Sequence, residues 1–413
     1  MKLVISHLTG NANVKGAVNG FITQNLLAEF YVSMGVFPGS LLDNIGNLKP
    51  FTEIKRRRFD PAVKPFIRSW PWYEMGRLLA TKAGFSKLTD PYGMFHIDSV
   101  CKNFDHHVAA RLKTADKSIG GIYCYEDVAE YSFTEAQKLG LKRIYDLPIG
   151  YWRAARRILD PEKEKWPEWA STMTGLMDSE EKLMRKDKEL ALADLIFVAS
   201  TFSANTLNEY PGNLPAVKVV PYGFPEVTDN RDYSVKKTGA PLKLLYVGSL
   251  SQRKGIANLF AAVDSLKNNV ELTLVGNKRS NDCLALEKAV SNHKWFPSLS
   301  HSQILALMRN SDVLVFPSLF EGFGLVITEA MSQGTPVITT DRTAGPDFIT
   351  DDQNGWLIEA GSTEAIKSAI ENLLLNPGLI RKTGLEAMET ARRRSWAMYE
   401  QELSVEVKNF LQQ

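Results

Sequence analysis

Cysteine is scarce in this sequence, and neither sign of charge is in marked excess. The 413 residues include only three cysteines, Cys101, Cys124 and Cys283, and their spacing is not typical of a metal site or a redox pair. This excludes a disulfide framework and predicts reduced thiols in a cytoplasmic protein. The 49 basic residues nearly balance the 47 acidic ones, so the net charge of +2 predicts no general attraction to nucleic acid.

Long hydrophobic runs are also missing. No segment approaches the roughly 18 consecutive apolar residues of a membrane-spanning helix. The apolar run within residues 1–10 is too short for a signal peptide. We therefore expect a soluble protein, and its length allows two or three domains, each with a full hydrophobic core.

What the sequence does contain is a repeated alternation of strand, glycine-rich loop and helix. The first unit is the apolar strand KLVIS, a loop over residues 7–16 and a helical pattern over 17–35. Further units follow, and the polar stretch 226–240 is the best candidate for a linker. The alternation restarts at 241–250, which predicts two α/β halves with parallel sheets. Ligands in such sheets bind where strands end in glycine-rich loops.

The first chemical motif is YVGSLSQRKGI, at residues 246–256. A strand ends at Gly248, and Arg253 and Lys254 lie just before the next helix. Two cations between a strand end and a helix N-terminus suit a diphosphate, because the guanidinium, the ammonium and the helix amides all favour negative charge. The alternative is a pair of solvated surface cations, and this motif alone does not decide between the two.

The second motif is LFEGFGLVITEAMSQGTPVIT, at residues 319–339. Glycines flank Phe323, and the helix that starts after them offers its N-terminal amides to an anion. Glu321 in the loop can face a sugar, and Glu329, a little more than one helical turn further on, can accept two ribose hydroxyls. The alternative assigns Glu329 to a solvated helix face and Glu321 to a helix cap.

Together these motifs resemble a known family. FPSLFEGFGLVITEAMSQGTPVI is similar to the E-x7-E motif of the retaining glycosyltransferases with the GT-B fold, family GT4. VGSLSQRKGI resembles the phosphate-binding loop of the same family, and TAGPDFITDDQNGWLI resembles its next strand–helix unit. The resemblance covers residues 190–400 well and 1–150 loosely.

The resemblance implies an α/β fold of the GT-B type, in which two Rossmann-like, doubly wound parallel-sheet domains face each other across a cleft. Residues 1–225 would form the acceptor-binding domain and residues 241–390 the nucleotide-sugar-binding domain. The segment 391–413 has the pattern of an amphipathic helix and would cross back to pack on the first domain.

The resemblance also implies roles for individual residues. Arg253 and Lys254 would hold the donor diphosphate and stabilise charge on the leaving nucleotide. Glu321 would hold the transferred sugar, and Glu329 would bind the ribose. Further donor-binding positions, mostly backbone groups in loops at strand ends, would be Gly10, Asn11, Gly248, Gly276, Phe296, Gly322, Phe323, Gly324 and Leu325.

The sequence departs from the family pattern at three places. Ser249 stands where many members carry an arginine, which leaves that charge to the basic pair further along the loop. Two acceptor-side positions that are often histidine are occupied by Tyr125-Glu126 and by Asp146. These residues and His7, at the end of the first strand, are the acceptor-side candidates, although His7 also fits a purely structural histidine.

The predicted activity is transfer of a sugar, with retention of configuration, from a UDP- or GDP-sugar to a glycan or lipid-linked acceptor in cell-envelope or exopolysaccharide biosynthesis. The basic pair would stabilise the leaving diphosphate, so we expect no metal ion and no other cofactor. In agreement, no Asp-x-Asp type of carboxylate pair stands at a predicted strand end, and TDDQN, at residues 350–354, has the pattern of an exposed turn. The alternatives are a sugar-nucleotide epimerase on the same fold and a non-catalytic glycan-binding homologue.

One basic and aromatic segment stands apart from these motifs. Residues 51–88 contain nine Lys or Arg residues against three acidic ones, with seven aromatic residues between them. We interpret the segment either as an ordinary basic loop and helix or as a peripheral contact with the anionic inner face of a membrane, with Trp70 and Trp72 at headgroup level. Nucleic-acid binding is disfavoured, because no binding module is recognisable.

Overall fold

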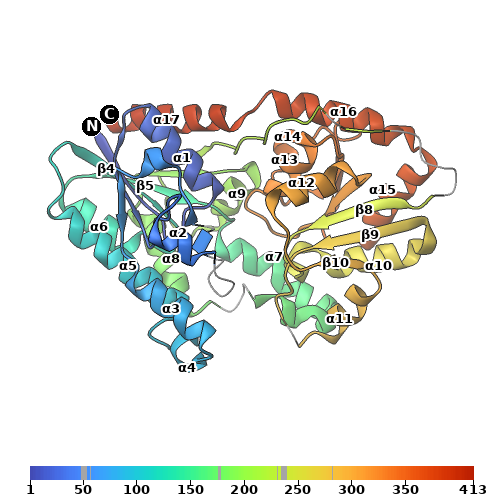
Figure 1. Ribbon diagram of the computed structural model, residues 1–413, viewed down its shortest axis with the longest axis horizontal. Coiled ribbons are helices and arrows are strands. Elements are labelled where there is room, and N and C mark those ends of the chain that lie inside the picture. Colours follow the sequence, from blue (N-terminus) through green and yellow to red (C-terminus); the bar gives the residue numbers. More distant parts are fainter. Residues whose placement is uncertain (48–53, 56, 175–177, 230, 234–239, 281) are drawn as a thin grey trace.

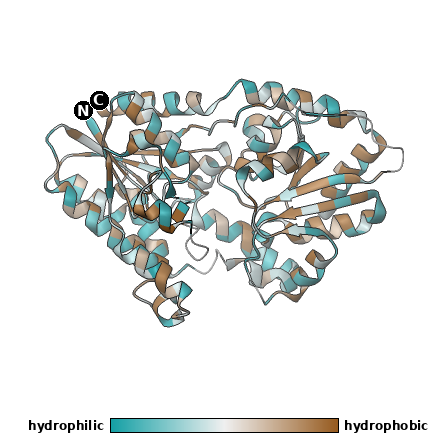
Figure 2. Cartoon of the chain, in the orientation of Figure 1, coloured by the Kyte–Doolittle hydropathy of each residue, from teal (hydrophilic) through white to brown (hydrophobic). Residues whose placement is uncertain are grey.

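Two parallel β-sheets, each packed between helices, form the two halves of the molecule (Figure 1). This computed structural model describes residues 1–413 except 48–53, 56, 175–177, 230, 234–239 and 281. The predicted linker 226–240 and the basic segment 51–88 therefore lie partly outside the described residues. Hydrophobic residues follow the central strands of both sheets, and the surrounding helices carry mixed bands (Figure 2).

The first sheet has seven strands in the order β3-β2-β1-β4-β5-β6-β7, and every neighbouring pair is parallel. Its strands are β1 (Lys2–Ser6), β2 (Leu27–Val32), β3 (Ile67–Ser69), β4 (Ile119–Tyr125), β5 (Lys142–Leu147), β6 (Leu195–Val198) and β7 (Val217–Val219). The strand order reverses between β1 and β4. The loops that follow Ser6 and Tyr125, the carboxyl ends of these strands, therefore lie at the edge where folds of this kind bind ligands.

The second sheet has six strands in the order β10-β9-β8-β11-β12-β13, again all parallel. Its strands are β8 (Leu242–Val247), β9 (Val270–Val275), β10 (Lys294–Phe296), β11 (Val313–Phe316), β12 (Val337–Thr340) and β13 (Trp356–Ile358). Here the order reverses between β8 and β11, whose following loops carry the two motifs of the sequence. Strands such as β11 are buried throughout because helices cover both faces, which explains their continuous apolar runs.

The helices fill the connections between the strands. In the first half they are α1 (Ala12–Thr23), α2 (Leu41–Ile45), α3 (Trp72–Lys82), α4 (Ser86–Thr89), α5 (Ile97–Leu112), α6 (Glu130–Lys138), α7 (Trp152–Lys165), α8 (Glu180–Leu192) and α9 (Thr201–Thr206). In the second half they are α10 (Ile256–Leu266), α11 (Leu284–Ser291), α12 (His301–Arg309), α13 (Leu325–Ser332), α14 (Gly345–Phe348), α15 (Thr363–Leu375), α16 (Gly378–Arg392) and α17 (Trp396–Gln412). Within the described part of the chain, none of them is both long and apolar enough to cross a membrane.

The first predicted helix, over residues 17–35, is wrong in its extent. Helix α1 begins at Ala12, inside the predicted loop, and ends at Thr23, and the second part of the predicted helix is the strand β2. Asn25 adopts a positive φ of 55°, which breaks the helix before the apolar run LAEFYV. A short apolar run of this kind fits a buried strand as well as a helix, and only pairing with β1 selects the strand.

The C-terminal helix α17 crosses back to the first domain, as predicted. It lies along α1, where Gly16 and Gly20 allow close contact (Figure 1). A Cβ atom at Gly20 would lie 2.3 Å from the carbonyl oxygen of Glu400, so a larger residue would push the two helices apart. The Ser395 side chain accepts a hydrogen bond from the Met398 amide and caps the start of α17.

A segment of the first half also crosses over, in the opposite direction. The turn of 3-10 helix η3 (Pro167–Thr172) packs on the second domain, where Trp169 stacks on Phe260 with ring centroids 5.7 Å apart. The Thr172 carbonyl accepts a hydrogen bond of 2.7 Å from the Ser251 hydroxyl. The two domains therefore exchange segments on both sides of the crevice.

Candidate active site

The loops after β8 and β9 are joined by backbone hydrogen bonds beyond the ends of the strands. The Gly248 amide donates to the Val275 carbonyl at 2.9 Å, and the Leu250 amide donates to Asn277 at 2.9 Å. Gly276 is required by this close approach, because a Cβ atom there would lie 1.8 Å from the Gly248 carbonyl oxygen. The two predicted glycines therefore shape one rigid pair of loops at the edge of the sheet.

The predicted basic pair lies in η6 (Gln252–Lys254), a single 3-10 turn directly before α10. The Arg253 guanidinium donates a hydrogen bond of 2.6 Å to the Phe320 carbonyl, and its Nη1 atom lies 3.6 Å from Glu321 Oε2. The Lys254 side chain is 9% exposed, and its ammonium forms an ion pair with the same carboxylate. The two sequence motifs thus meet at one cluster, and part of the positive charge of the first is balanced by the second.

The loop of the second motif also forms one of the contacts between the two domains. The Gly322 carbonyl accepts hydrogen bonds from the hydroxyls of Ser200 at 2.5 Å and Ser203 at 3.0 Å, both in the first half of the chain. A Cβ atom at Gly322 would lie 2.0 Å from the carbonyl oxygen of Pro148. Glycine at this position therefore allows the loop to reach the first domain.

Phe323, between the two glycines, does not point into a ligand site. Its side chain is 3% exposed and packs on Tyr222 and Phe348, with ring centroids 4.8 Å and 5.7 Å away. Only the backbone around Phe323 is then available to a sugar, as the prediction assumed. Gly324 has a φ of 88° and leads into α13, which begins at Leu325.

Glu329 and Phe296 belong to elements of the second domain, the helix α13 and the strand β10. Glu329 is in α13, and its Oε1 atom lies 3.5 Å from Nδ1 of His301. Burial raises the pKa of Glu329, while the neighbouring His301 acts to lower it. The Phe296 carbonyl, at the end of β10, accepts a hydrogen bond of 2.9 Å from the Gly276 amide. The predicted roles of these residues toward a nucleotide remain predictions.

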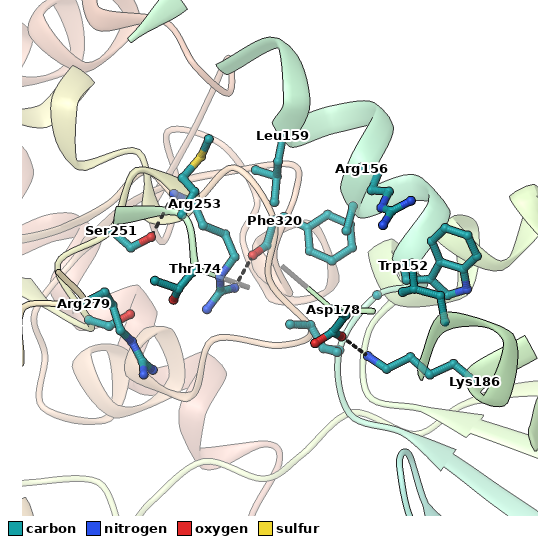
Figure 3. A pocket seen from close by; sticks show the side chains of 16 residues that line it. Trp152, Arg156, Leu159, Thr174, Asp178, Lys186, Ser251, Arg253, Arg279 and Phe320 are labelled. Atoms are coloured by element: carbon teal, nitrogen blue, oxygen red, sulfur yellow. Dashed lines mark hydrogen bonds and ion pairs between the residues drawn. The ribbon is translucent and has the colours of Figure 1, made fainter. Parts of the chain in front are cut away.

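A cavity of about 280 Å³ lies between the two domains beside the basic pair (Figure 3). Its wall on the second domain consists of Ser249, Ser251, Arg253, Arg279 and Phe320. Its wall on the first domain consists of Ile149, Gly150, Trp152, Ala155, Arg156, Leu159, Met173, Thr174, Asp178, Leu183 and Lys186. Arg253 is the one predicted site residue on these walls. Arg279 was missed, although it follows Gly276 closely in a loop at a strand end.

The first-domain wall presents a buried ion-pair network. Lys186 lies 3.2 Å from Asp178 and 3.4 Å from Glu126, measured from Nζ to the nearest carboxylate oxygen. Burial raises the pKa of Glu126, whereas the positive charge of Lys186 acts to lower it. Glu126, an acceptor-side candidate, thus does not line the cavity itself. It contacts Lys186, which does, and helps to hold that side chain in place.

Two other acceptor-side candidates, Asp146 and Tyr125, lie in the core of the first domain. Asp146 is 4% exposed and accepts a hydrogen bond of 2.5 Å from the Tyr123 hydroxyl, and Tyr125 is 1% exposed. His7 accepts hydrogen bonds from the amides of Thr9 at 3.0 Å and Gly10 at 2.8 Å. Burial lowers the pKa of His7 to about 4, so this residue is a neutral, structural histidine that shapes the loop before α1.

The loop that contains Gly10 and Asn11, two predicted donor-binding residues, makes some of its contacts within the first domain. The Gly10 amide is taken by His7, and a Cβ atom at Gly10 would lie 2.4 Å from the Phe59 ring. Asn11 is exposed at the start of α1, and its side chain makes no capping hydrogen bond to that helix. Among the described residues, no group of three or more His, Cys, Asp or Glu side chains is arranged to hold a metal ion.

The buried Asp146 makes folding stability depend on pH. Burial raises the pKa of Asp146 to about 7, so between pH 4 and 7 the folded chain keeps a proton that the unfolded chain has lost. The free energy of unfolding therefore falls as the pH rises through this range. In Asp146→Asn this dependence disappears. We expect the variant to gain stability over the wild type from pH 5 to 7, with no further gain above pH 8.

Urea unfolding of both proteins at pH 5, 6, 7 and 8 measures this difference, and titration of all other groups cancels in the comparison. A difference that does not change with pH would contradict the assignment of Asp146 to the core. Turnover of the variant is expected to stay near that of the wild type, because Asp146 is not on the cavity walls.

Comparison with known proteins finds relatives of the second half of the chain. Residues 228–393 match the family described as Glycosyl transferases group 1. The chain is 28% identical over 160 residues to glycogen synthase of Mycobacterium tuberculosis, a match that covers 37% of this chain and 38% of that protein. It is 31% identical over 144 residues to the capsular polysaccharide biosynthesis glycosyltransferase CapM of Staphylococcus aureus, covering 33% of this chain and 38% of that protein. The matched part thus spans well under half the length of these relatives.

Solved structures resemble the chain over its whole length. Sucrose-phosphate synthase from Thermosynechococcus elongatus superposes with a TM-score of 0.69 at 16% identity and 99% coverage of both chains. Anabaena HepE in complex with UDP and glucose superposes with a TM-score of 0.65 at 16% identity, covering 99% of this chain and 100% of that one. Together with the two parallel sheets, these likenesses confirm the predicted GT-B fold, and the family match confirms the predicted resemblance.

Proposed function

We propose that this chain, whose residues 228–393 belong to the glycosyl transferases group 1 family, moves a sugar from a nucleotide-sugar donor to a glycan or lipid-linked acceptor. The observation that carries the proposal is the meeting of Arg253, Lys254 and Glu321 beside a cavity that both domains line. In this proposal the donor binds to the second-domain wall of the cavity, and the acceptor binds to the first-domain wall.

The chemistry of the site follows from the charge that develops during transfer. The leaving diphosphate gains negative charge, and Arg253 stabilises it together with the N-terminal amides of α10. Lys254 holds the Glu321 carboxylate in place and contributes its own positive charge from behind the loop. Retention then proceeds by attack on the face from which the diphosphate departs, and a diphosphate oxygen takes the acceptor proton. This scheme needs neither a metal ion nor a pair of carboxylates with glycosidase spacing.

The acceptor side is supplied by the first-domain wall. Asp178 is the carboxylate that lines the cavity, and Lys186 fixes its position. A carboxylate and an ammonium that are held side by side can bind neighbouring hydroxyls of a sugar ring. The indole of Trp152 is on the same wall (Figure 3). These groups suit a carbohydrate acceptor of the kind found in cell-envelope or exopolysaccharide biosynthesis.

A donor screen tests the proposed function. The full-length chain is incubated with UDP-, GDP- and ADP-sugars, with and without monosaccharide, oligosaccharide and lipid-linked acceptors, and nucleotide release is measured. We expect one UDP- or GDP-sugar to release its nucleotide faster with an acceptor, and the product to keep the anomeric configuration of the donor. Conversion of the donor sugar without nucleotide release would show an epimerase. Glycan binding without any turnover would show a non-catalytic homologue.

We also propose that the first domain docks on an anionic membrane, through a surface that differs in part from the predicted one. Large apolar side chains that are 36% to 102% exposed gather on α3, α4 and the loop after them, namely Trp72, Met75, Leu79, Phe85, Leu88, Tyr92, Met94 and Ile97. These helices project from the first domain, and part of the tip is hydrophobic (Figures 1 and 2). An exposed apolar patch of this size, with an aromatic residue at its edge, suits the headgroup region of a bilayer.

Two residues of the segment 51–88 are less available to lipids than the sequence indicated. Trp70 is half-buried, stacks on His107, and its indole donates a hydrogen bond of 2.9 Å to Asn103. Arg57 is buried and forms an ion pair with Glu74, so its charge is not available to lipids. The apolar residues therefore contribute more to docking than the count of basic residues indicated.

Sedimentation with anionic phospholipid vesicles tests the docking surface at low and moderate salt. We expect the wild type to bind, and the double variant Trp72→Ser/Phe85→Ser to lose most of this binding. Leu375→Ser is the matched control, because Leu375 is 80% exposed on the second domain. Absence of binding at low salt, or equal losses in the two variants, would contradict the proposal.

A further inference from the structure

We propose that Arg279 supplies a second guanidinium to the donor diphosphate, in addition to that of Arg253. This inference rests on the proposed function and adds a residue that neither motif contains. Arg279 lies in the loop after β9, 26 positions away from Arg253 in the sequence, and both residues line the same wall of the cavity (Figure 3).

The position of Arg279 is set by rigid backbone pairing. The bridge between Leu250 and Lys278 continues the pairing of β8 with β9 beyond the strand ends. In a parallel pair, the residues that follow the bridge also lie beside each other. Arg279 is therefore carried to the level of Ser251, directly before the turn that holds Arg253. A guanidinium on this frame is placed without the entropy cost of ordering a flexible loop.

The two neighbouring cations of this loop have different partners. Lys278 forms an ion pair with Glu287 and lies over the Trp295 ring, 4.4 Å from its centroid. Arg279 is exposed and makes no hydrogen bond or ion pair to another side chain in the part of the chain that the structure describes. Lys278 thus has a structural role, whereas the five donors of Arg279 are available to a ligand.

The charge balance of the site indicates which ligand Arg279 would bind. On the second-domain side of the site, three cations, Arg253, Lys254 and Arg279, are balanced by the single carboxylate of Glu321. These four groups together carry an excess of two positive charges. Burial, and then the charges of Arg253 and Arg279, act to lower the pKa of Lys254, which places all three cations within electrostatic reach of one another. The diphosphate of a nucleotide sugar carries two negative charges. Such a group would relieve this repulsion, and two guanidiniums can each bind it in a bidentate manner.

Calorimetric binding of inorganic pyrophosphate, UDP, GDP and ADP to the full-length chain tests the inference. We expect Arg279→Ala to bind pyrophosphate and the preferred nucleotide about tenfold more weakly than the wild type, which corresponds to about 1.4 kcal/mol. Lys278→Ala is the control and should bind both as the wild type does. Because Arg279 is exposed, thermal unfolding of Arg279→Ala should match that of the wild type.

A second variant tests whether the affinity depends on the positive charge of Arg279 rather than on its exact position. Ser249 lines the same wall, so Ser249→Arg/Arg279→Ala places a guanidinium at another point of the cavity and should recover part of the lost affinity. Equal affinity of Arg279→Ala and the wild type for pyrophosphate and the nucleotides would overturn the role of Arg279. In contrast, failure of the wild type to bind any of the nucleotides would count against the proposed function itself.

Discussion

Replacing Lys254 by methionine is expected to lower kcat/KM by about 10²- to 10³-fold, the usual cost of removing one preorganised electrostatic group. The ammonium is buried behind the 319–324 loop, pairs with Glu321 and lies 5.0 Å from the centroid of the Phe316 ring. Methionine keeps the unbranched stem that packs on this ring and removes only the charge. The loss is therefore expected in turnover, and the apolar packing is kept.

The ion pair predicts a second effect of the same substitution. Without Lys254, the Glu321 carboxylate is left largely buried, and its remaining ion pair among the described residues is with Arg253, 3.6 Å away. Breaking a buried pair in this way costs about 3–5 kcal/mol of stability. The contact with Glu321 therefore gives Lys254 a part in stability as well as a place in the site.

The double variant Lys254→Met/Glu321→Gln separates the two effects. It removes both charges, so the free energy of unfolding in urea should return toward the wild-type value, while turnover stays low. The measurements are kcat/KM with the donor identified by the screen and urea unfolding of all three proteins. Wild-type turnover in Lys254→Met would remove Lys254 from the mechanism. Recovery of turnover in the double variant would show that the single variant had failed only through instability.

Gly322→Ala is expected to open the contact between the two domains and to reduce turnover by about 10²-fold or more, because misplacement of about 1 Å at a reacting centre already costs that much. The added Cβ atom would lie 2.0 Å from the Pro148 carbonyl oxygen and 2.7 Å from Cα of Ile149. Both neighbours are backbone atoms, so no side chain can rotate away. The loop has to withdraw from the first domain, and its hydrogen bonds from Ser200 and Ser203 are lost with it.

Small-angle scattering and turnover measure this effect together. The radius of gyration of Gly322→Ala should increase, and circular dichroism should show that both domains keep their helices. Gly378→Ala is a matched control, because a Cβ atom at Gly378 would meet no described atom within 4 Å apart from its chain neighbours and its own helix backbone. Unchanged scattering together with unchanged turnover would mean that the observed domain contact is not needed for the reaction.

Local patterns in the sequence were sufficient to predict the class of fold and the two loops that meet beside the cavity. Alternating apolar runs and glycine-rich loops reflect burial and turn geometry, which depend on neighbours close in the chain. For this reason Arg253, Lys254 and Glu321 could be named before any tertiary structure was known. The same local reasoning failed at residues 24–32, where a short apolar run fits a helix and a strand equally well and pairing with β1 decides.

The partners of these residues were decided only by the tertiary structure. Strand order brings Arg279 to the same cavity wall as Arg253, and the neighbouring positions of β8 and β11 bring Lys254 to Glu321. The packing of the first domain also buries Asp146 among tyrosines, so this acceptor-side candidate does not line the cavity. The physical reason is that a sequence pattern determines which side chains are buried and where loops end. Which buried or loop side chains meet depends on contacts between residues far apart in the chain, and these form only when both sheets are folded and packed.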